Sequence, residues 1–568
     1  MNWKIKEKRE IKEFASINLH PVILGIIADR GYDTEEKINN FLYPDYAKGL
    51  FDPFLFSDME KVLERIESAK ERNEKIIIFG DYDADGVTSS AILAETLENI
   101  GLSPNVYIPD KKLEGYGMNL GAVDEFQKQN VKLIITVDCG ITNQKEVEKA
   151  NGCGIDCIII DHHHIPEKLP EAYAIINPNL KNSGYPFSEL AGVGVTFKVV
   201  EALYRKFLPD KLEQLKWILD IVAIGTVADC VPLVKENRVI TKFGLIVLSK
   251  TKRLGLLELF KVARLRIDEN NFPNARTIAF QIAPRINAAG RMDHANTAFK
   301  LIRETNEVKA RDLSLELEGN NQKRQKVTGQ IVDEIRVLAK NMFKDKKFIF
   351  AVSEHFSIGV VGLAAGKIAE EFNKPTAVIN KGENESHGSF RSIPQVNIIE
   401  AIEKCSELLV KFGGHSQAAG ITVENKNLDK FFEKLGAIIE EELKDKDVTP
   451  ITEIDAEIFP KEMDFDLSQG IKKMEPFGHG NEEPVFLMKN LLVDELMRVG
   501  NGEKHLKMFL KSQDGTPKVF EAIGFNLTNG FSHLKKGDKI DVVFNICEDD
   551  WNGNKKIQLK IIDLKIVS

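Results

Sequence analysis

Between Lys75 and Val231, short runs of β-branched residues alternate with helical stretches, and this pattern restricts the fold more than any other feature of the sequence. Such alternation is typical of a parallel sheet covered by helices, so we predict an α/β domain here. The expected strands are 76–79, 133–137, 158–160 and 174–176, and the first three lead into Asp81, Asp138 and Asp161. Because ligands bind beyond the carboxyl ends of strands in open α/β sheets, we expect these aspartates to line one crevice.

The domain organisation follows from the length and from changes in patterning. A chain of 568 residues exceeds what one hydrophobic core usually serves. Helical periodicity interrupted at Gly319 predicts a long linking helix, and strand patterning with an Asn552-Gly553 turn predicts a C-terminal β-barrel. The expected segments are an N-terminal helical extension (1–70), the parallel-sheet α/β domain (71–308), the linking helix (309–340), a smaller α/β domain (341–447) and the barrel (448–568).

Composition excludes several classes of protein. The chain is 43% hydrophobic and 29% charged, and we find no apolar run long enough to cross a bilayer. Its first residues lack the apolar core of a secretory signal, and its six cysteines lack zinc-ligand spacing. We therefore expect a cytoplasmic protein with reduced thiols and no membrane partner. A net charge of −9 still permits nucleic acid, because binding needs only a local basic groove.

Three carboxylates stand at alternating positions after the first expected strand. They are Asp81, Asp83 and Asp85, and Gly86 follows at the start of a helical stretch. Alternate residues of an extended segment point the same way, so these side chains can share a hard cation. Taken alone, an acidic turn of this kind is more often simply solvated.

Further candidate ligands follow other elements of the same domain. Asp138 and 161–163 (Asp-His-His) come at strand ends, and Asp229 comes at the end of an apolar helix. A single aspartate of this kind is more often a helix cap or turn residue. Together these groups at one sheet edge favour a metal site, and carboxylate-rich ligation without thiolates suits Mn²⁺ or Mg²⁺. Two such ions would suit phosphoester hydrolysis.

At these positions the sequence resembles the DHH phosphoesterase superfamily, whose four motifs end in DxD, D, DHH and D. The resemblance implies five metal ligands: Asp83, Asp85, Asp138, His162 and Asp229. It implies that His163 lies beside the ions or the scissile phosphate and that Asp138 and Asp161 are further catalytic groups. Asp81 would support the ligands without binding an ion itself.

Within that superfamily the chain is most similar to the RecJ family of exonucleases. The additional matching segments are 108–109, 114–117, 190–194, 284–291 and 476–478, which span nearly the whole chain. The resemblance implies a DHH domain, a linking helix, a DHH-associated domain and an OB-type barrel. It further implies a monomeric, Mn²⁺- or Mg²⁺-dependent 5′→3′ exonuclease specific for single-stranded DNA. Such an enzyme works in recombination and repair beside a single-stranded-DNA-binding protein and a helicase.

The smaller α/β domain carries glycine-rich segments, 388–392 and 413–420, that resemble the DHH-associated substrate domain. Glycines let backbone amides approach a phosphate, and the Arg391 guanidinium can donate two hydrogen bonds to it in a bidentate contact. The resemblance implies Ser389, Arg391 and Lys111 as anchors of the 5′-phosphate. Lys111 stands where relatives often carry arginine, and a lysine offers a point charge in place of a bidentate fork. Further expected DNA contacts are Arg285, Asn287, Arg291 and His415, with Trp551, Lys555 and Lys556 in the barrel.

Two other functions remain open at this point. A DHH phosphodiesterase acting on short oligonucleotides or cyclic dinucleotides would share the motifs, although such relatives usually lack the terminal barrel. A non-catalytic single-strand-binding scaffold would lose metal ligands, and none is lost here. Inorganic pyrophosphatases of the superfamily use a histidine upstream of the first aspartate pair, where this chain has Phe79-Gly80-Asp81.

Overall fold

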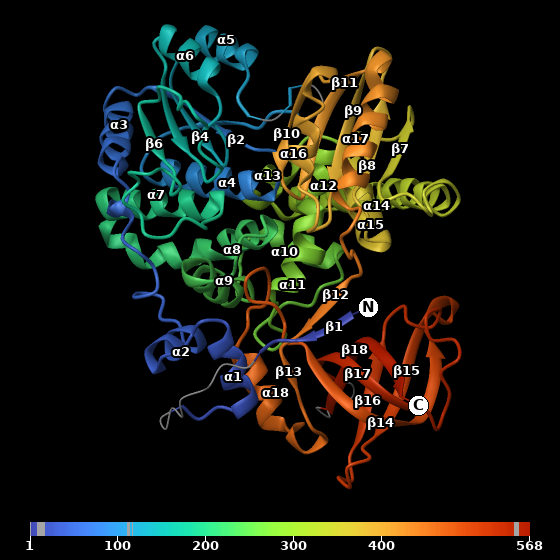
Figure 1. Ribbon diagram of the computed structural model, residues 1–568. Coiled ribbons are helices and arrows are strands. Elements are labelled where there is room, and N and C mark those ends of the chain that lie inside the picture. The colour runs from blue at the N-terminus through green and yellow to red at the C-terminus, as the bar shows by residue number, and fades with distance from the viewer. Residues whose placement is uncertain (1, 8–16, 111–113, 116, 550–555, 568) are drawn as a thin grey trace. The chain divides into compact units, whose positions relative to one another are not determined.

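The computed structural model describes residues 2–7, 17–110, 114–115, 117–549 and 556–567 (Figure 1). The chain divides into two compact units. One comprises Met1–Leu50, Pro232–Lys242 and Pro450–Ser568, and the other comprises Phe51–Val231 and Phe243–Thr449. In the described part of the chain, helices that combine the length and the apolar character needed to span a membrane are absent.

A five-stranded parallel sheet forms the centre of the first α/β domain, in the order β3-β2-β4-β5-β6. The strands are β2 (Lys75–Gly80), β3 (Asn105–Tyr107), β4 (Val131–Val137), β5 (Asp156–Ile160) and β6 (Ala174–Ile176). The predicted parallel sheet is confirmed. It also contains the short edge strand β3, which the pattern did not predict.

Helices cover this sheet, which explains why its strands are continuous apolar runs. The helices are α3 (Met59–Glu71), α4 (Ala84–Asn99), α5 (Leu120–Lys128), α6 (Gln144–Gly152), α7 (Gly192–Phe207) and α8 (Leu219–Ala228), with short turns η1 (Pro53–Leu55) and η2 (Pro209–Ile218). Ile77 and Ile134 share one core cluster with Phe126 of α5 and Val147 of α6. Helix α4 contacts β2 and β4, and it packs on α7 and α8. The loops after β2, β4 and β5 therefore open at one edge of the sheet.

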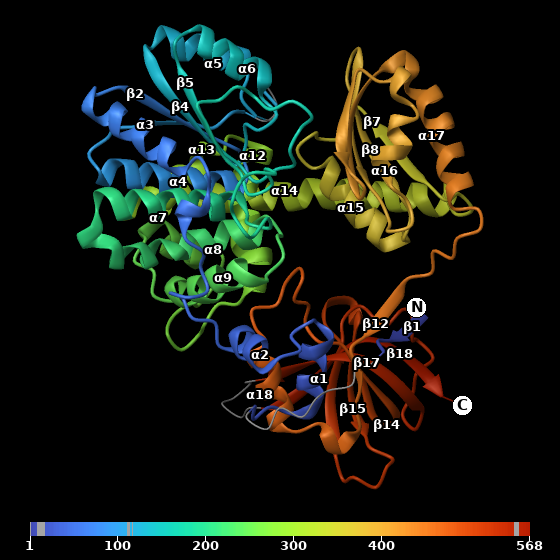
Figure 2. The same ribbon diagram turned by 60° about the vertical axis from the view of Figure 1, so that its left-hand side comes forward.

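A helical segment follows and ends in a long helix. Its elements are α9 (Lys235–Leu248), α10 (Leu254–Val262), α11 (Ala275–Thr277), η3 (Ile278–Ile282), α12 (Ala283–Met292), α13 (Asn296–Arg303) and α14 (Glu307–Met342). Helix α14 has 36 residues and begins at the N-cap Asn306, whose side chain accepts from the Lys309 N–H at 3.1 Å. Figure 2 shows α14 running from the region of α12 and α13 to α15, and it contacts all three of these helices.

The second α/β domain has a mixed sheet in the order β10-β11-β9-β8-β7. Its elements are β7 (Ile349–Ser353), α15 (Val361–Phe372), β8 (Thr376–Lys381), β9 (Glu385–Arg391), α16 (Ile398–Glu403), η4 (Ser406–Leu408), β10 (Lys411–His415), β11 (Ala418–Glu424), η5 (Asn425–Asn427) and α17 (Leu428–Glu442). Among the strands of this sheet that the structure describes, β7 and β8 pair in parallel, and the other neighbouring pairs are antiparallel. Helix α15 contacts β8 and β9, and Gly362 in its first turn lies next to Ser389 of β9.

The other unit contains a closed five-stranded barrel. Strands β14-β15-β16-β18-β17 follow in order, and β14 also pairs with β17, which closes the circle. The elements of this unit are β1 (Asn2–Ile5), α1 (Pro21–Asp29), α2 (Glu35–Leu42), β12 (Ile451–Ile454), β13 (Ala456–Glu457), η6 (Pro460–Glu462), α18 (Phe465–Lys473), β14 (Phe486–Val499), η7 (Asn501–Glu503), β15 (His505–Lys511), β16 (Val519–Gly524), β17 (Lys539–Asp549) and β18 (Lys556–Val567). The predicted barrel is confirmed.

The N-terminal segment differs from the expected extension over 1–70. Strand β1 pairs in parallel with β12, and Ile23 and Ile27 of α1 share one core cluster with Met508 and Phe544 of the barrel. Residues 1–50 therefore belong to the unit that contains the barrel, whereas 51–70 belong to the unit with the parallel sheet. The reason is hydrophobic burial, because the apolar face of α1 is covered by residues far away in the sequence.

Candidate metal centre

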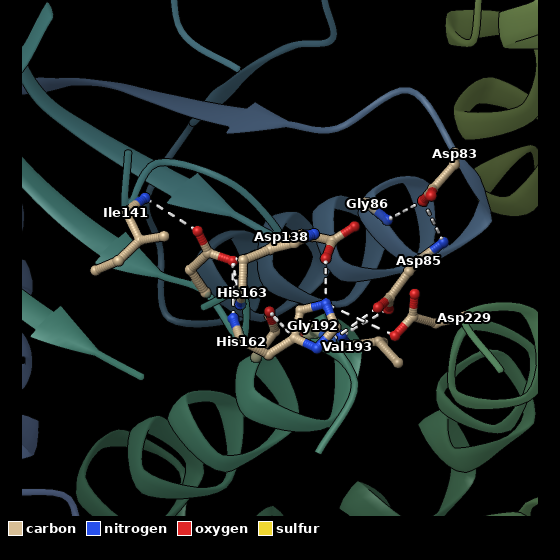
Figure 3. Close-up of polar contacts among 12 residues, drawn as sticks. Asp83, Asp85, Gly86, Asp138, Ile141, His162, His163, Gly192, Val193 and Asp229 are labelled. Atoms are coloured by element: carbon tan, nitrogen blue, oxygen red, sulfur yellow. Dashed lines mark hydrogen bonds and ion pairs between the residues drawn. The ribbon is translucent and has the colours of Figure 1, made fainter. Parts of the chain in front are cut away.

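Asp83 and Asp85 are held at the start of α4 by backbone N–H groups. Asp83 is the N-cap residue, and its Oδ1 accepts from the N–H groups of Asp85 at 2.9 Å and Gly86 at 3.1 Å. The buried carboxylate of Asp85 accepts from Gly192 and Val193, each at 2.7 Å, at the first turn of α7 (Figure 3). Burial, followed by repulsion from Asp83, raises the pKa of Asp85 to about 7, although these amides oppose the shift.

Asp138 and His162 face each other at the same edge of the parallel sheet. Asp138 follows β4 with φ of 59°, and its pKa is raised well above the usual range by burial and then by repulsion from Asp85. His162 Nε2 lies 3.3 Å from Asp138 Oδ1 and 3.6 Å from Asp229 Oδ2. Burial lowers the pKa of His162 to about 4, so its ring is neutral, and a hydrogen bond to the Leu190 carbonyl orients it. Burial, with repulsion from Asp85 and Asp83, raises the pKa of Asp229 to about 9.

Asp161 orders the two histidines that follow it. Its Oδ1 accepts from the N–H groups of His162 at 2.7 Å and His163 at 3.1 Å, and it lies 2.7 Å from His163 Nδ1. Its Oδ2 accepts from the Ile141 N–H at 3.0 Å. Burial lowers the pKa of His163, but the hydrogen bond and charge of Asp161 outweigh it and raise that pKa to about 9. His163 is therefore an imidazolium at neutral pH, while His162 is neutral.

The donor set fits divalent cations. Three groups of possible ligand atoms each lie within 4.8 Å of one another: Asp138, His162 and His163; Asp85, His162 and Asp229; and Asp81, Asp83 and Asp138. Within the described residues, Asp138 Oδ1 and His162 Nε2 are buried and have no hydrogen-bond partner. Buried polar atoms normally have partners, so these two atoms are placed for a ligand. Carboxylate oxygens with one neutral imidazole suit Mn²⁺ or Mg²⁺.

The predicted phosphate anchors Ser389 and Arg391 lie together on β9, against the first turn of α15. A Cβ placed on Gly362 would stand 2.9 Å from Ser389 Oγ and 3.7 Å from Arg391 Nη2, so the glycine leaves room for both side chains next to the helix. Burial lowers the pKa of Arg391, and repulsion from Arg291 adds to the effect. Two guanidinium groups that repel each other in a partly buried place would be stabilised by an anion.

Helix α12 carries residues that lie near both Arg391 and the start of α4. The side chain of Asn287 accepts from the Ala84 N–H at 2.7 Å and so fixes the first turn of α4. Asn287 and Arg291 line a cavity of about 170 Å³. Arg285 is oriented differently, because its Nε donates to Glu318 Oε2 at 2.6 Å and its Nη1 donates to the Gln281 carbonyl at 2.6 Å.

Arg324 of α14 lines the same cavity and was not among the predicted site residues. Its Nη2 donates to Asn321 Oδ1 at 2.9 Å, while Nε is buried and has no hydrogen-bond partner in the described part of the protein. Burial lowers the pKa of Arg324, and repulsion from Arg291 and Arg285 adds to this. The only feature of the sequence that could have indicated a role for Arg324 is the polar run around 320–325, and the solvated face of a helix would show the same pattern.

The other predicted contacts have different outcomes. The ring of His415 on β10 lies 5.2 Å from that of His164, next to the Asp-His-His segment. Lys556 is exposed at the start of β18. Lys111, Trp551 and Lys555 lie outside the residues that the structure describes.

Comparison with known proteins agrees with this geometry. Three family models match: the DHH family, N-terminal domain, over 75–226; the DHHA1 domain, over 345–441; and the RecJ OB domain, over 454–563. The single-stranded-DNA-specific exonuclease RecJ of Bacillus subtilis (strain 168) is 35% identical over 571 residues, covering 100% of this chain and 71% of that protein. RecJ of Escherichia coli (strain K12) is 32% identical and covers 98% of both chains. The chain belongs to the RecJ family.

Solved structures of RecJ have the same architecture. The crystal structure of RecJ in complex with Mn²⁺ from Thermus thermophilus matches with a TM-score of 0.84 and 25% identity, over 99% of this chain and 79% of that one. A crystal structure of exonuclease RecJ bound to manganese matches with a TM-score of 0.60 and 28% identity, over 70% of this chain and 99% of that one. Both of these RecJ structures contain manganese. This chain places acidic and imidazole groups close enough together to hold such an ion.

Proposed function

We propose that this chain is a single-stranded-DNA-specific exonuclease that degrades its substrate in the 5′→3′ direction and releases 5′-mononucleotides, using Mn²⁺ or Mg²⁺. One observation carries the proposal. His162 Nε2 and Asp138 Oδ1 lie 3.3 Å apart, buried and without hydrogen-bond partners in the described residues, among carboxylates whose pKa values are raised. Such an arrangement is unfavourable by itself and becomes favourable when cations bind.

The metal ligands in this proposal are Asp83, Asp85, Asp138, His162 and Asp229. Divalent ions held by these residues would supply Lewis-acid chemistry suited to phosphodiester hydrolysis. The protein supplies the fixed geometry. The amides of Gly192 and Val193 hold Asp85, and the Leu190 carbonyl orients the ring of His162. These contacts keep the ligand atoms in place before substrate arrives.

His163 has a different role, because its ring is charged. The Asp161 carboxylate holds Nδ1 at 2.7 Å and keeps the imidazolium beside the cluster. The side chain of His163 is 39% exposed, so a phosphate can reach it. A cation at this place offsets the negative charge that develops on a phosphate under attack.

The direction of degradation depends on where the terminal phosphate binds. Ser389 and Arg391, against Gly362, are proposed to hold the 5′-phosphate, with Lys111 as a third anchor and His415 beside the metal centre. Arg291 lies close enough to repel Arg391 and also lines the cavity next to Asn287. A terminal phosphate held there would place the next phosphodiester at the metals, so that mononucleotides leave from the 5′ end.

Membership of the RecJ family supports wider proposals about the setting. We expect a monomeric cytoplasmic enzyme that acts in DNA recombination and repair beside a helicase and a single-stranded-DNA-binding protein. The barrel, with Trp551, Lys555 and Lys556 as contacts, would hold the incoming strand, as OB-type barrels commonly do. Arg285 would contribute its charge near the strand without direct contact while it is paired with Glu318.

A nuclease assay tests the central proposal. Single-stranded DNA labelled at either end, with a 5′-phosphate or 5′-hydroxyl, is incubated with the protein and Mn²⁺ beside a blunt duplex. We expect immediate release of mononucleotide from the 5′-labelled strand, no digestion of the duplex, and none with chelator or with Asp138→Asn. Hydrolysis confined to short oligonucleotides or cyclic dinucleotides would replace the proposal with the small-substrate alternative. Strand binding without hydrolysis, unchanged by Asp138→Asn, would support the scaffold.

A further inference from the structure

The loop that follows β6 contacts the backbone of the two histidines at the metal centre through side-chain amides. Asn177 Nδ2 donates to the His163 carbonyl at 3.0 Å. Asn179 Nδ2 donates to the His162 carbonyl at 2.6 Å. A carbonyl oxygen only accepts hydrogen bonds, so each amide must turn its nitrogen towards the histidine. The carbonyl groups of a proposed metal ligand and of the adjacent imidazolium are therefore each held by one asparagine.

These contacts continue the parallel sheet beyond the last paired residues of β5 and β6. The pairing ends at Ile160 and Ile176, and the Asp161 N–H still donates to the Ile176 carbonyl at 3.0 Å. The next two residues, His162 and His163, lie outside the strand, and their carbonyls meet the amides of the loop. A backbone carbonyl away from water needs such a partner. The Asn-Pro-Asn sequence directly after β6 supplies it for both residues.

The loop is itself held in one shape by hydrogen bonds. Asn177 is fully buried, and its Oδ1 accepts from the Asn179 N–H at 2.8 Å. Ser183 Oγ donates to the Pro178 carbonyl at 3.2 Å, and the Ser183 carbonyl accepts from the Ser57 N–H at 2.9 Å. The side chain of Asn177 therefore joins the loop to the histidine backbone. The side chain of Asn179 adds a contact whose loss leaves these hydrogen bonds of the loop in place.

The position of His162 Nε2 depends on the backbone that carries the ring. That atom lies 3.3 Å from Asp138 Oδ1, and both atoms are buried. The Leu190 carbonyl orients the ring, whereas the Asn179 amide holds the peptide group of His162. A displacement of this peptide group is transmitted to the ligand atom, because a single methylene joins the imidazole to the backbone.

We infer that Asn177 and Asn179 are positioning residues of the metal centre with separable effects. Asn179 fixes the place of the ligand His162, and Asn177 fixes the place of the charged ring of His163. The inference rests on the proposed function, because it takes His162 to bind an ion and His163 to face the phosphate. Each asparagine acts through the backbone of a histidine. Loss of contacts that orient metal ligands typically lowers metal affinity or activity by about 10- to 100-fold.

Asn179→Ala tests the contact with the metal ligand. The alanine removes the amide but keeps the N–H that bonds to Asn177. Mn²⁺ is titrated into the metal-free, full-length protein, and the free ion is measured by electron paramagnetic resonance. We expect the Mn²⁺ affinity to fall about tenfold. Hydrolysis of a 5′-phosphorylated single strand should fall at low Mn²⁺ and recover at high Mn²⁺, with KM for the strand unchanged. An unchanged Mn²⁺ affinity would overturn the role of Asn179.

Asn177→Asp tests the contact with His163. The aspartate keeps an oxygen for the Asn179 N–H, but it replaces the amide donor by an oxygen that repels the His163 carbonyl. At saturating Mn²⁺ we expect kcat to fall about 10- to 100-fold, while KM and the Mn²⁺ affinity stay within about twofold of the wild type. A loss of Mn²⁺ affinity as large as in Asn179→Ala, or an unchanged kcat, would show that the two contacts do not act separately.

A matched control and a stability measurement separate positioning from general damage. Asn151 Nδ2 donates to the Glu171 carbonyl at 2.8 Å, which is the same kind of contact at an exposed place in the same domain. Asn151→Ala should therefore behave like the wild type in both assays. Urea unfolding of each metal-free variant shows whether it folds. If Asn177→Asp does not fold, Asn177→Ser takes its place, because serine is neutral and its hydroxyl can accept from the Asn179 N–H.

The outcomes distinguish this inference from the proposed function. If the wild type binds Mn²⁺ but hydrolyses no DNA, the proposed function fails, and the Mn²⁺ titration of Asn179→Ala still decides whether Asn179 positions His162. If the wild type hydrolyses DNA and the variants at 177 and 179 match it in Mn²⁺ affinity and kcat, the inference alone fails. A wild type that binds no Mn²⁺ would overturn both.

Discussion

Gly192 lies so close to Asp138 that a Cβ on the glycine would stand 2.4 Å from the Asp138 Oδ1 atom. The carboxylate oxygen that faces His162 therefore rests on the first turn of α7. We predict that Gly192→Ala displaces Asp138 and lowers both Mn²⁺ affinity and the rate of hydrolysis about 100-fold, since a displacement of ~1 Å at a reacting group can have that effect. Isothermal titration with Mn²⁺ and single-turnover hydrolysis would measure the two losses.

Gly319→Ala is the matched control for this substitution. Gly319 is exposed inside α14, and nothing lies within 4 Å of the position that its Cβ would take. Alanine is the better helix former by about 1 kcal/mol, so this variant should be slightly more stable and as active as the wild type. Equal metal affinity in both alanine variants would show that the contact with Asp138 has no bearing on the ligands.

Asp161→Asn is expected to separate positioning from ligation. The asparagine keeps one oxygen for the backbone N–H groups, but it removes the charge that raises the pKa of His163 to about 9. We predict that the pKa of His163 falls and that hydrolysis slows about 10- to 100-fold, while Mn²⁺ binds with little change. An NMR titration of the His163 ring, compared with activity over the same pH range, is the measurement. An unchanged His163 pKa together with reduced activity would contradict this explanation.

The sequence allowed the parallel sheet, and the gathering of most of the proposed metal ligands at one of its edges, to be predicted for one physical reason. Strands covered by helices on both faces are continuous apolar runs, and the loop after each run must reach the same edge of the sheet. Asp83, Asp138 and His162 could therefore be placed together without coordinates. The edge strand β3 was missed because three residues, Asn105–Tyr107, carry too little pattern to distinguish them from a loop.

Features that depend on distant partners could not be predicted in this way. The indole N–H of Trp3 donates to Asp563 at 2.9 Å, a contact across 560 positions that no local pattern encodes. Arg324 belongs to the site only because α14 packs on α12, and in the sequence it is one polar residue in a polar helix.

Arg391→Lys should reduce selection for a 5′-phosphate. A lysine keeps the positive charge but loses the planar fork of donors, which matters where a terminal phosphate is bound bidentately. We predict that the ratio of kcat/KM for 5′-phosphorylated over 5′-hydroxyl strands falls about tenfold, mainly through KM for the phosphorylated strand. Arg336→Lys is the matched control, because Arg336 on α14 is paired with Glu371 and should leave the ratio unchanged. An unaltered ratio in Arg391→Lys would remove Arg391 from the proposed anchor.

The stability of the metal-free protein should fall as pH rises from about 5 to about 9. Folding raises the pKa of Asp85 from 3.8 to about 7 and that of Asp229 from 3.8 to about 9, so the folded state retains protons that the unfolded chain releases. His163, raised from 6.5 to about 9, acts in the same direction, since its favourable charge is lost as pH passes that value. The lowered pKa of His162, from 6.5 to about 4, acts in the opposite direction below about pH 6.5, but it is one group against the raised carboxyls Asp85 and Asp229. The lowered pKa of Asp161 acts only in more acidic solution. Urea unfolding at several pH values should show that the unfolding midpoint of the metal-free wild type decreases as pH rises. The decrease should be shallower for Asp229→Asn. Mn²⁺ should stabilise the wild type, and this stabilisation should grow with pH because cations bind the ionised carboxylates. A midpoint that rises over this range without metal would show that these carboxylates are not held close together in the folded protein.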